Sequence, residues 1–271
     1  MKQIYLLSLM WLSCGALMAQ SAGQQSAELP SAGQPDGPLT AQSSGYTVGN
    51  AHSHNDYWQP VPFWTAYRAG FGSIEADIFL RGDSLYVGHD WKDLRPERTL
   101  ESLYLTPLQQ VMQEPGAHKV QMLIELKTDA VPTLTALIHL LETAYPALVR
   151  DGRVRWAITG KLPDYRLWNS FPSYIGFDGD FTISYPDSAL QRVALFSADL
   201  KQYTRWYGEG AIPASDRERL EQVIARTHAV GKPVRFWDAP DNANAWTQLM
   251  GLKVDWINTD HIAALASFLG K

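Results

Sequence analysis

The sequence predicts an α/β protein of the TIM or (β/α)8 barrel class, and three observations support this. From residue 46 onward, short β-type runs alternate with longer stretches of helical periodicity, which is the pattern of repeated βα units around a parallel sheet. Eight strand candidates can be counted, the number that a TIM barrel requires. The segment 46–271 has the length of a small member of that class.

The strand candidates are short runs rich in β-branched and aromatic residues. In chain order they are Thr47–His52, Ser73–Leu80, Val120–Lys127, Val154–Thr159, Tyr174–Asp178, Val193–Ala198, Pro233–Asp238 and Val254–Asn258. A further run, Asp83–Asp90, predicts a hairpin arm after the second strand, because Leu85 and Val87 alternate with polar neighbours.

Helical periodicity fills most of the connections between these strands. The predicted helices are Phe63–Ala69, Thr99–Gln113, Val131–Val149, Asp216–Val230, Ala243–Met250 and Ile262–Leu269. Gly70, Gly231 and Gly251 follow helical runs where a left-handed C-cap is expected, and Asp216 is the expected N-cap of its helix. The segment Phe181–Arg192 shows little helical periodicity and is the weakest joint of the barrel.

The N-terminal segment has the features of an export signal. Lys2 precedes an apolar run from Ile4 to Leu12 and then small residues up to Ala19, which predicts a secretory signal peptide over 1–19. That run is shorter than the ~20 residues that span a bilayer. Cys14 is the only cysteine, and an alternative is a lipoprotein in which Cys14 carries a lipid. We expect an exported protein, either periplasmic or secreted.

The following segment, 20–45, consists largely of Gln, Ser, Ala, Gly and Pro, a composition that predicts a disordered leader. A single catalytic domain is therefore expected over 46–271. The formal net charge is −5, which argues against a nucleic-acid-binding surface. No transmembrane segment is expected.

Acidic residues interrupt two of the predicted strands. Active sites of TIM barrels form at the carboxyl ends of the strands. Glu75 and Asp77 are two residues apart, so both point to one face of their strand, and Glu125 ends the next barrel strand. Unpaired carboxylates in an apolar strand would be costly. Their oxygens suit Ca²⁺ or Mg²⁺ better than zinc, so the sequence predicts one divalent cation here.

Three histidines lie at strand ends or on the hairpin arm beside these carboxylates. They are His52, His54 and His89, and an imidazole can accept or donate a proton near neutral pH. The sequence therefore predicts general acid/base catalysis next to the cation.

Four motifs resemble one enzyme superfamily, which comprises the phosphatidylinositol-specific phospholipases C and the glycerophosphodiester phosphodiesterases. They are His54-Asn55-Asp56-Tyr57, Ser73-Ile74-Glu75-Ala76-Asp77, Leu85-Tyr86-Val87-Gly88-His89-Asp90 and Ile124-Glu125-Leu126-Lys127. They look most like the branch of the fungal altered inheritance of mitochondria protein 6. Val234-Arg235-Phe236-Trp237 and the run from Val254 to Asp260 look like the last two strands of glycerophosphodiesterases.

The resemblance implies a phosphodiesterase in which particular residues carry the chemistry. It implies His54 and His89 as the catalytic histidines, Asn55, Glu75, Asp77 and Glu125 as metal ligands, and Lys127 as a residue facing the phosphate. Glycerophosphodiesterases carry His-Arg-Gly at the first strand, and His52 is an alternative first histidine. No Arg-Gly follows either histidine, so neither the phosphate-binding arginine nor glycerol specificity is implied. The expected substrate is a small-molecule or lipid-head-group phosphodiester, either glycerophosphodiester or phosphoinositide-like.

Two rival interpretations and three side chains stay open. An amidohydrolase or PHP-type metallohydrolase would use His52 and His54, with Asp260 after the last strand, but it also needs histidines at the ends of strands five and six. A non-catalytic barrel that binds a head group is the other rival. Trp237 either walls the alcohol part of the substrate or packs in the barrel. Asp178 and Asp180 either extend the polar rim or are turn residues.

Overall fold

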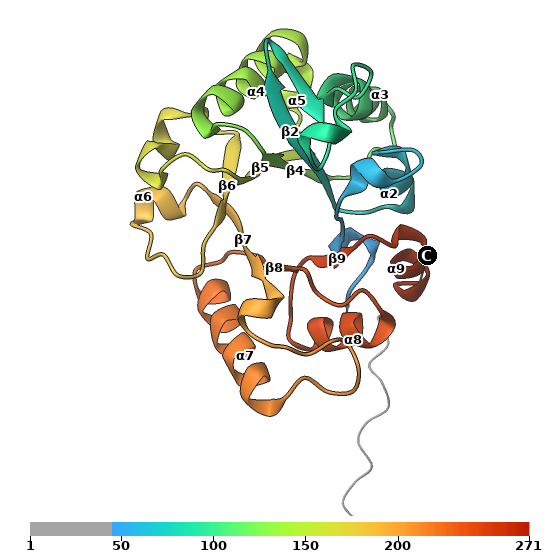
Figure 1. Ribbon diagram of the computed structural model, residues 1–271, viewed down its shortest axis with the longest axis vertical. Coiled ribbons are helices and arrows are strands. Elements are labelled where there is room, and N and C mark those ends of the chain that lie inside the picture. Colours follow the sequence, from blue (N-terminus) through green and yellow to red (C-terminus); the bar gives the residue numbers. More distant parts are fainter. Residues whose placement is uncertain (1–44, 271) are drawn as a thin grey trace, which may run out of the picture. The chain divides into compact units, whose positions relative to one another are not determined.

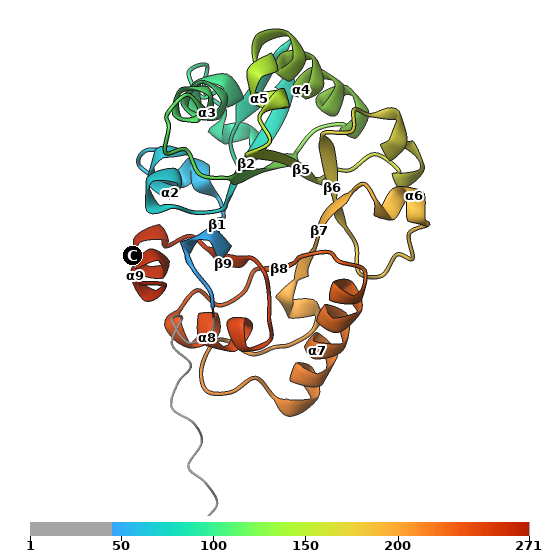
Figure 2. The same ribbon diagram turned by 180° about the vertical axis from the view of Figure 1, so that it is seen from behind.

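The computed structural model describes residues 45–270. The predicted signal peptide (1–19) with Cys14, and the predicted leader up to residue 44, lie outside the described residues. Within 45–270 the chain forms a ring of parallel strands with helices packed around its outside (Figures 1 and 2). None of these helices combines the length and the hydropathy needed to span a bilayer.

Eight parallel strands form the barrel in the order β8-β7-β6-β5-β4-β2-β1-β9. They are β1 (Ala51–Ser53), β2 (Ser73–Arg81), β4 (Val120–Leu126), β5 (Val154–Gly160), β6 (Ile175–Gly179), β7 (Val193–Asp199), β8 (Val234–Trp237) and β9 (Ile257–Thr259). β8 approaches β9 through a single isolated bridge between Arg235 and Trp256. The predicted barrel class is therefore confirmed, with a nearly closed seam between β8 and β9.

The predicted hairpin arm is also present. Strand β3 (Ser84–Val87) pairs antiparallel with the end of β2, with Ile78 opposite Val87. The arm carries the chain to Gly88 and His89, and the backbone N–H of Gly88 donates to the carbonyl of Asp77 at 3.2 Å. This contact brings the histidine back beside the carboxyl end of β2.

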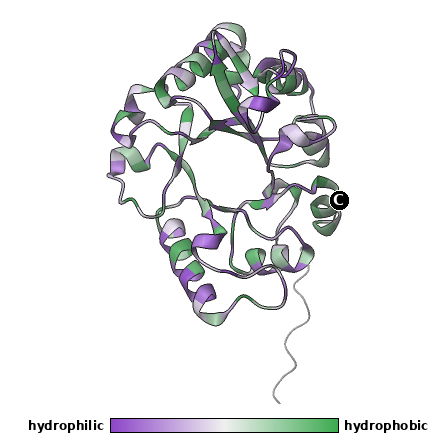
Figure 3. Ribbon diagram, in the orientation of Figure 1, coloured by the Kyte–Doolittle hydropathy of each residue, from purple (hydrophilic) through white to green (hydrophobic). Residues whose placement is uncertain are grey.

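The main helices follow the predicted βα pattern. They are α2 (Trp64–Ala69), α3 (Thr106–Met112), α4 (Ala130–Ala144), α5 (Pro146–Arg150), α6 (Asp187–Leu190), α7 (Ala214–Ala229), α8 (Ala243–Gly251) and α9 (Ile262–Phe268). Hydrophilic and hydrophobic residues mix along α7, whereas α9 is mostly hydrophobic (Figure 3). Leu220, Val223, Ile224 and Thr227 are the buried residues of α7, so only part of its surface packs on the barrel.

Several local predictions were wrong, for identifiable reasons. The first strand is shorter than predicted because residues Val48–Asn50 form a 3-10 turn capped by Thr47. The helix predicted over 131–149 breaks at Tyr145, because the residue before a proline avoids the helical region. A π-helical turn, Glu101–Leu105, precedes α3 within the predicted helix 99–113.

Two of the four predicted caps were wrong. Gly70 and Gly231 adopt the left-handed conformation, with φ of 84° and 70°. Gly251 instead stays within α8, and the left-handed residue is Lys253, with φ of 65°. Helix α7 starts after Pro213, which places Asp216 inside its first turn, where a negative charge still favours the helix dipole.

The barrel interior sets the position of the site through the two-residue period of its strands. Leu123, Ala157 and Leu195 form a small buried cluster separate from the main core. The residues two positions further along the same strands are Glu125, Thr159 and Ser197, and all three line a cavity. In each of these three strands, an apolar side chain inside the barrel is therefore followed, two residues towards the carboxyl end, by a polar side chain that lines the cavity.

Candidate functional site

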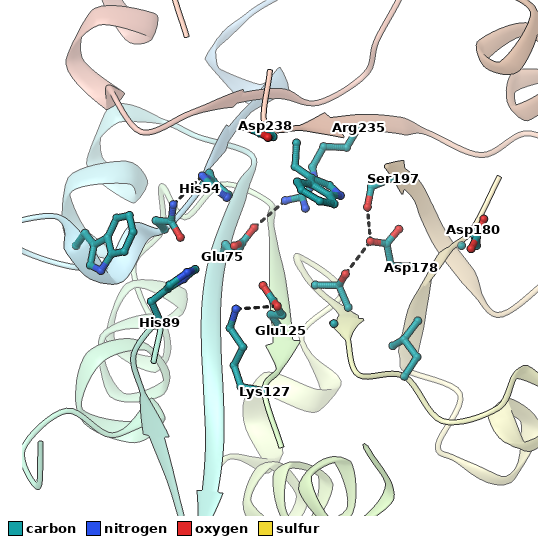
Figure 4. A pocket seen from close by; sticks show the side chains of 17 residues that line it. His54, Glu75, His89, Glu125, Lys127, Asp178, Asp180, Ser197, Arg235 and Asp238 are labelled. Carbon is teal, nitrogen blue, oxygen red and sulfur yellow. Dashed lines mark hydrogen bonds and ion pairs between the residues drawn. The ribbon is translucent and has the colours of Figure 1, made fainter. Parts of the chain in front are cut away.

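A cavity of about 730 Å³ opens at the carboxyl ends of the strands. The side chains on its β1–β4 side include His54, Asn55, Glu75, His89, Glu125 and Lys127. Those on its β5–β8 side include Thr159, Asp178, Ser197, Arg235, Trp237 and Asp238. Figure 4 shows His89 and Lys127 on one side of the cavity and Asp178 and Ser197 on the other, with Arg235 joined to Glu75.

Three of the predicted metal ligands come together on the β1–β4 side. One carboxylate oxygen from each of Glu75, Asp77 and Glu125 lies within 4.8 Å of the other two. Glu75 and Asp77 share a face of β2, and Asp77 is in register with Glu125 on β4. The spacing in the sequence thus produces the convergence through ordinary parallel pairing.

Two cations neutralise part of this cluster. The Lys127 ammonium donates to Asp77 Oδ2 and to Glu125 Oε1, each at 2.8 Å. Arg235 reaches across from β8, and its Nη1 donates to Glu75 Oε2 at 2.7 Å. Lys127 was predicted to face a phosphate, whereas Arg235 was assigned no role. Arg235 could have been found in the sequence, because it is a charged residue within an otherwise apolar strand, the same feature that identified Glu75.

The carboxylates of the cluster repel one another more strongly than the two cations compensate. Burial alone would raise the pKa of Glu75, but Arg235 and His52 outweigh it and lower that pKa. Burial, together with the charges of Glu75 and Glu125, raises the pKa of Asp77 to about 8 despite Lys127. Asp77 Oδ1 is buried with no hydrogen-bond partner among the described residues. A hard cation would relieve both features, so the donor set fits Ca²⁺ or Mg²⁺.

Two of the three predicted catalytic histidines line the cavity. His54 Nδ1 lies 2.8 Å from Asp260 Oδ1. Burial lowers the pKa of His54, but the hydrogen bond to Asp260 and the charge of Glu75 raise it above its usual value. His89 Nδ1 lies 3.1 Å from the Tyr57 hydroxyl, and its side chain is 45% exposed. In both residues the contact is made by Nδ1, and Nε2 takes no part in it.

His52 lies behind the carboxylate cluster rather than at the cavity wall. It is fully buried, with Nδ1 2.8 Å from Ser73 Oγ and Nε2 2.6 Å from Arg235 Nη1. Burial, assisted by the charge of Arg235, lowers its pKa to about 4. His52 therefore stays neutral. Its Nε2 also lies 3.0 Å from Glu75 Oε2, so the tautomer of the ring decides whether Nε2 accepts from Arg235 or donates to Glu75. This geometry argues against its predicted role as acid or base, and equally against the rival metallohydrolase that needs His52 and His54 on one ion.

Tyr57 connects several members of the site, although the sequence gave it no role beyond its place in a motif. Its buried hydroxyl lies 2.5 Å from Asn55 Oδ1, 2.8 Å from Asp77 Oδ2 and 3.1 Å from His89 Nδ1. Asn55 adopts the left-handed conformation, with φ of 46°, which Asn tolerates better than most residues. Tyr57 thus ties the predicted ligand Asn55 to Asp77 and to His89.

The β5–β8 side carries a second set of polar groups. Asp178 is only 6% exposed, and its Oδ2 accepts hydrogen bonds from Thr159, at 2.8 Å, and from Ser197. Burial raises its pKa. Asp178 is therefore part of the cavity wall. Asp180 also lines the cavity but caps a turn by accepting from Thr182. Trp237 is 38% exposed and lines the cavity.

Two family models match the chain. The AIM6-like phosphodiesterase domain matches residues 43–132, the segment that holds His54, the three carboxylates, His89 and Lys127. The glycerophosphoryl diester phosphodiesterase family matches residues 233–263, which include Arg235 and Asp260. The two matches thus cover both ends of the barrel and most of its charged site.

Curated relatives show the same likeness. The altered inheritance of mitochondria protein 6 homolog of Arthroderma benhamiae is 54% identical over 69 residues, but the match spans only 23% of this chain and 22% of that protein. Altered inheritance of mitochondria protein 6 of Eremothecium gossypii is 24% identical over 80% of this chain and 68% of its own length. The Lachancea thermotolerans protein is 25% identical over 91% of this chain and 71% of its own.

Solved structures agree with the barrel. A glycerophosphodiester phosphodiesterase from Parabacteroides distasonis superposes with a TM-score of 0.56 and 15% identity, covering 81% of this chain and 96% of that one. A calcium-dependent phosphoinositol-specific phospholipase C from Pseudomonas sp. gives 0.55 and 12%, covering 80% and 91%. The family matches, the relatives and this fold together make the chain similar to the AIM6-like phosphodiesterase domain and to the glycerophosphoryl diester phosphodiesterase family, which lie within the PLC-like phosphodiesterase superfamily.

Proposed function

We propose that this chain is a metal-dependent phosphodiesterase that cleaves a glycerophosphodiester or phosphoinositide-like substrate by histidine acid/base catalysis. One observation carries the proposal: three carboxylates converge at one wall of the cavity, and His54 and His89 line the same wall. A phosphodiester carries one negative charge, so a cavity built from carboxylates alone would repel it. A divalent cation resolves this conflict.

Glu75, Asp77 and Glu125, with Asn55 beside them, are the residues that would hold the cation. When bound, such a cation neutralises the phosphate and lowers the pKa of a hydroxyl next to it. Lys127 has two roles in this proposal: its ammonium pairs with both Asp77 and Glu125, and it can turn towards a phosphate oxygen of the substrate. Arg235 keeps Glu75 ionised, as the lowered pKa of that carboxyl requires.

The two histidines divide the proton transfers between them. A hydroxyl oxygen attacks phosphorus and forms a P–O bond, while one imidazole Nε2 accepts its proton. The P–O bond to the leaving alcohol breaks, and the other imidazole donates a proton to that oxygen. Asp260 orients His54 through Nδ1, and the Tyr57 hydroxyl does the same for His89. Their positions, fixed before substrate arrives, supply much of the rate.

The first test is metal removal. Protein treated with a chelator and desalted should release p-nitrophenol from bis(p-nitrophenyl) phosphate at less than about a hundredth of the untreated rate, because positioning and charge neutralisation both depend on the cation. Adding Ca²⁺ or Mg²⁺ should restore the rate, and whichever does so at the lower concentration is the preferred ion. Full activity without divalent ions would refute the metal dependence, and restoration by zinc alone would favour a different metallohydrolase.

We also propose that the protein is exported, on the support of the N-terminal sequence alone. The apolar run after Lys2 and the small residues up to Ala19 are typical of a cleaved signal. Intact mass measurement of protein expressed in a bacterial host with its full leader should give a chain that starts at Gln20. A chain that keeps Met1 would refute export by this route, and a lipid mass on Cys14 would identify the lipoprotein alternative.

A further inference from the structure

Asp56 is a fully buried carboxylate that the proposed reaction does not use. It follows His54 and Asn55 and precedes Tyr57, so it lies within the same motif as three residues of the site. His54 and Asn55 line the cavity, whereas Asp56 is not among the described residues that do so. A carboxylate is costly to bury unless hydrogen bonds satisfy it, so its partners indicate what it does.

Three donors within residues 45–270 converge on the Asp56 carboxylate. The Ser53 hydroxyl, at the end of β1, donates to Oδ1 at 2.8 Å. The backbone N–H of Phe63, just before α2, donates to Oδ2 at 2.6 Å. The Tyr104 hydroxyl, in the π-helical turn before α3, donates to the same oxygen at 3.1 Å. Asp56 therefore joins both ends of the segment between β1 and α2 at one buried point.

The segment that Asp56 joins contains two residues with positive φ. Asn55 has φ of 46° and ψ of 36°, and Phe63 has φ of 63° and ψ of −58°. The second is the conformation of a γ-turn, in which the Trp64 N–H donates to the Pro62 carbonyl at 2.7 Å, and it is strained for a bulky residue. Such strain persists only where the surroundings enforce it. The hydrogen bond from Phe63 to Asp56 is one contact that does so.

We propose that Asp56 is a positioning residue: by joining the two ends of the segment 53–63, it sets where His54 and Asn55 stand in the cavity. This inference rests on the proposed function, in which His54 transfers a proton and Asn55 contributes to the cation site. In this role Asp56 touches neither substrate nor cation. It acts through the backbone, so its acceptor oxygens matter and its charge does not.

Two contacts of the site depend on the backbone of this segment. Asn55 Oδ1 lies 2.5 Å from the Tyr57 hydroxyl, and His54 Nδ1 lies 2.8 Å from Asp260 Oδ1. Replacing a residue that orients the ligands of a cation typically changes the affinity for that cation by about 10- to 100-fold. A displaced histidine also lowers turnover, because proton transfer requires the correct geometry.

The test compares Asp56→Ala with Asp56→Asn. Alanine leaves the three donors without their acceptor, whereas the amide can direct its oxygen to the Phe63 N–H and the Tyr104 hydroxyl, and its NH₂ to the Ser53 oxygen. In Asp56→Ala, the Kd for Ca²⁺ or Mg²⁺ measured by calorimetry should rise about 10- to 100-fold. Its kcat for bis(p-nitrophenyl) phosphate should stay below the parent value even at saturating cation. Asp56→Asn should restore both values to near those of the parent.

Hydrogen exchange of the metal-free protein gives a readout that needs neither cation nor substrate. Amides of the segment 54–63 should exchange faster in Asp56→Ala than in the parent, and at the parent rate in Asp56→Asn. If Asp56→Ala does not fold, Ser53→Ala carries the test. It removes one of the three donors, so it should shift the Kd, kcat and exchange rates in the same direction by a smaller amount.

The matched control is Asp151→Ala. Asp151 also holds a turn, because its Oδ1 accepts from the backbone N–H and the Nε of Arg153, but it lies before β5, at the amino end of the barrel. Its loss should leave the Kd and kcat unchanged. Parent-like values in Asp56→Ala, or equal losses in Asp56→Ala and Asp56→Asn, would overturn the inference while the proposed function stands. A parent that binds neither ion and hydrolyses no diester would overturn both.

Discussion

Replacing His89 by alanine should lower kcat about 10²- to 10⁴-fold, the range typical for the loss of a general acid or base. The side chain is 45% exposed and its ring contacts Trp58 at the cavity wall. Its loss therefore removes chemistry without opening a cavity in the core. Turnover of bis(p-nitrophenyl) phosphate under saturating substrate measures the effect.

A matched histidine makes this result specific. His139 lies exposed on α4, away from the cavity, so His139→Ala should keep the parent rate. Both variants should unfold at the parent's urea concentration. A His89→Ala protein that turns over at the parent rate would remove His89 from the mechanism.

Replacing Glu75 by alanine should abolish turnover and also destabilise the fold. Its carboxylate is the partner of the Arg235 guanidinium, and both side chains are at least 95% buried. Removing one member of a buried pair leaves the other charge uncompensated, which costs roughly 3–5 kcal/mol. Urea unfolding followed by circular dichroism should show that loss, alongside the absence of product in the turnover assay.

Glu125→Ala separates the two effects. Glu125 belongs to the same carboxylate cluster, but its side chain is 27% exposed and its partner Lys127 keeps Asp77. Activity should therefore fall as it does in Glu75→Ala, whereas the unfolding midpoint should move little. Equal stability losses in both variants would show that Arg235 does not depend on Glu75 as its counter-charge.

The barrel could be predicted because short segments of the sequence are enough to indicate each of its strands and helices. Each strand is a short β-type run, and each connection carries its own periodicity. The wrong predictions also concern local structure, but there the sequence signal is weaker. The turn at 48–50, the break at Tyr145 and the cap at Lys253 each depend on which of several competing backbone conformations has the lowest free energy. Sequence patterns do not resolve the small free-energy differences between such backbone conformations.

The site could be predicted only where neighbouring strands supply it. Glu75, Asp77 and Glu125 meet through adjacent strands in parallel register, which the two-residue period already implies. Arg235 reaches Glu75 across 160 positions of chain, and no periodicity encodes that distance. The burial of His52 was missed for the same reason, since its position depends on Ser73, Glu75 and Arg235 together.

The nearly closed seam between β8 and β9 makes formation of the site depend on closure of the barrel. A folding intermediate that has β1 and β2 but has not docked β8 would hold Glu75 without its guanidinium. Such a species would be both less compact and inactive, because the docking of β8 is what closes the ring and also what brings Arg235 to Glu75. Proteolysis or mutation near this seam should therefore inactivate the enzyme before the rest of the barrel has melted.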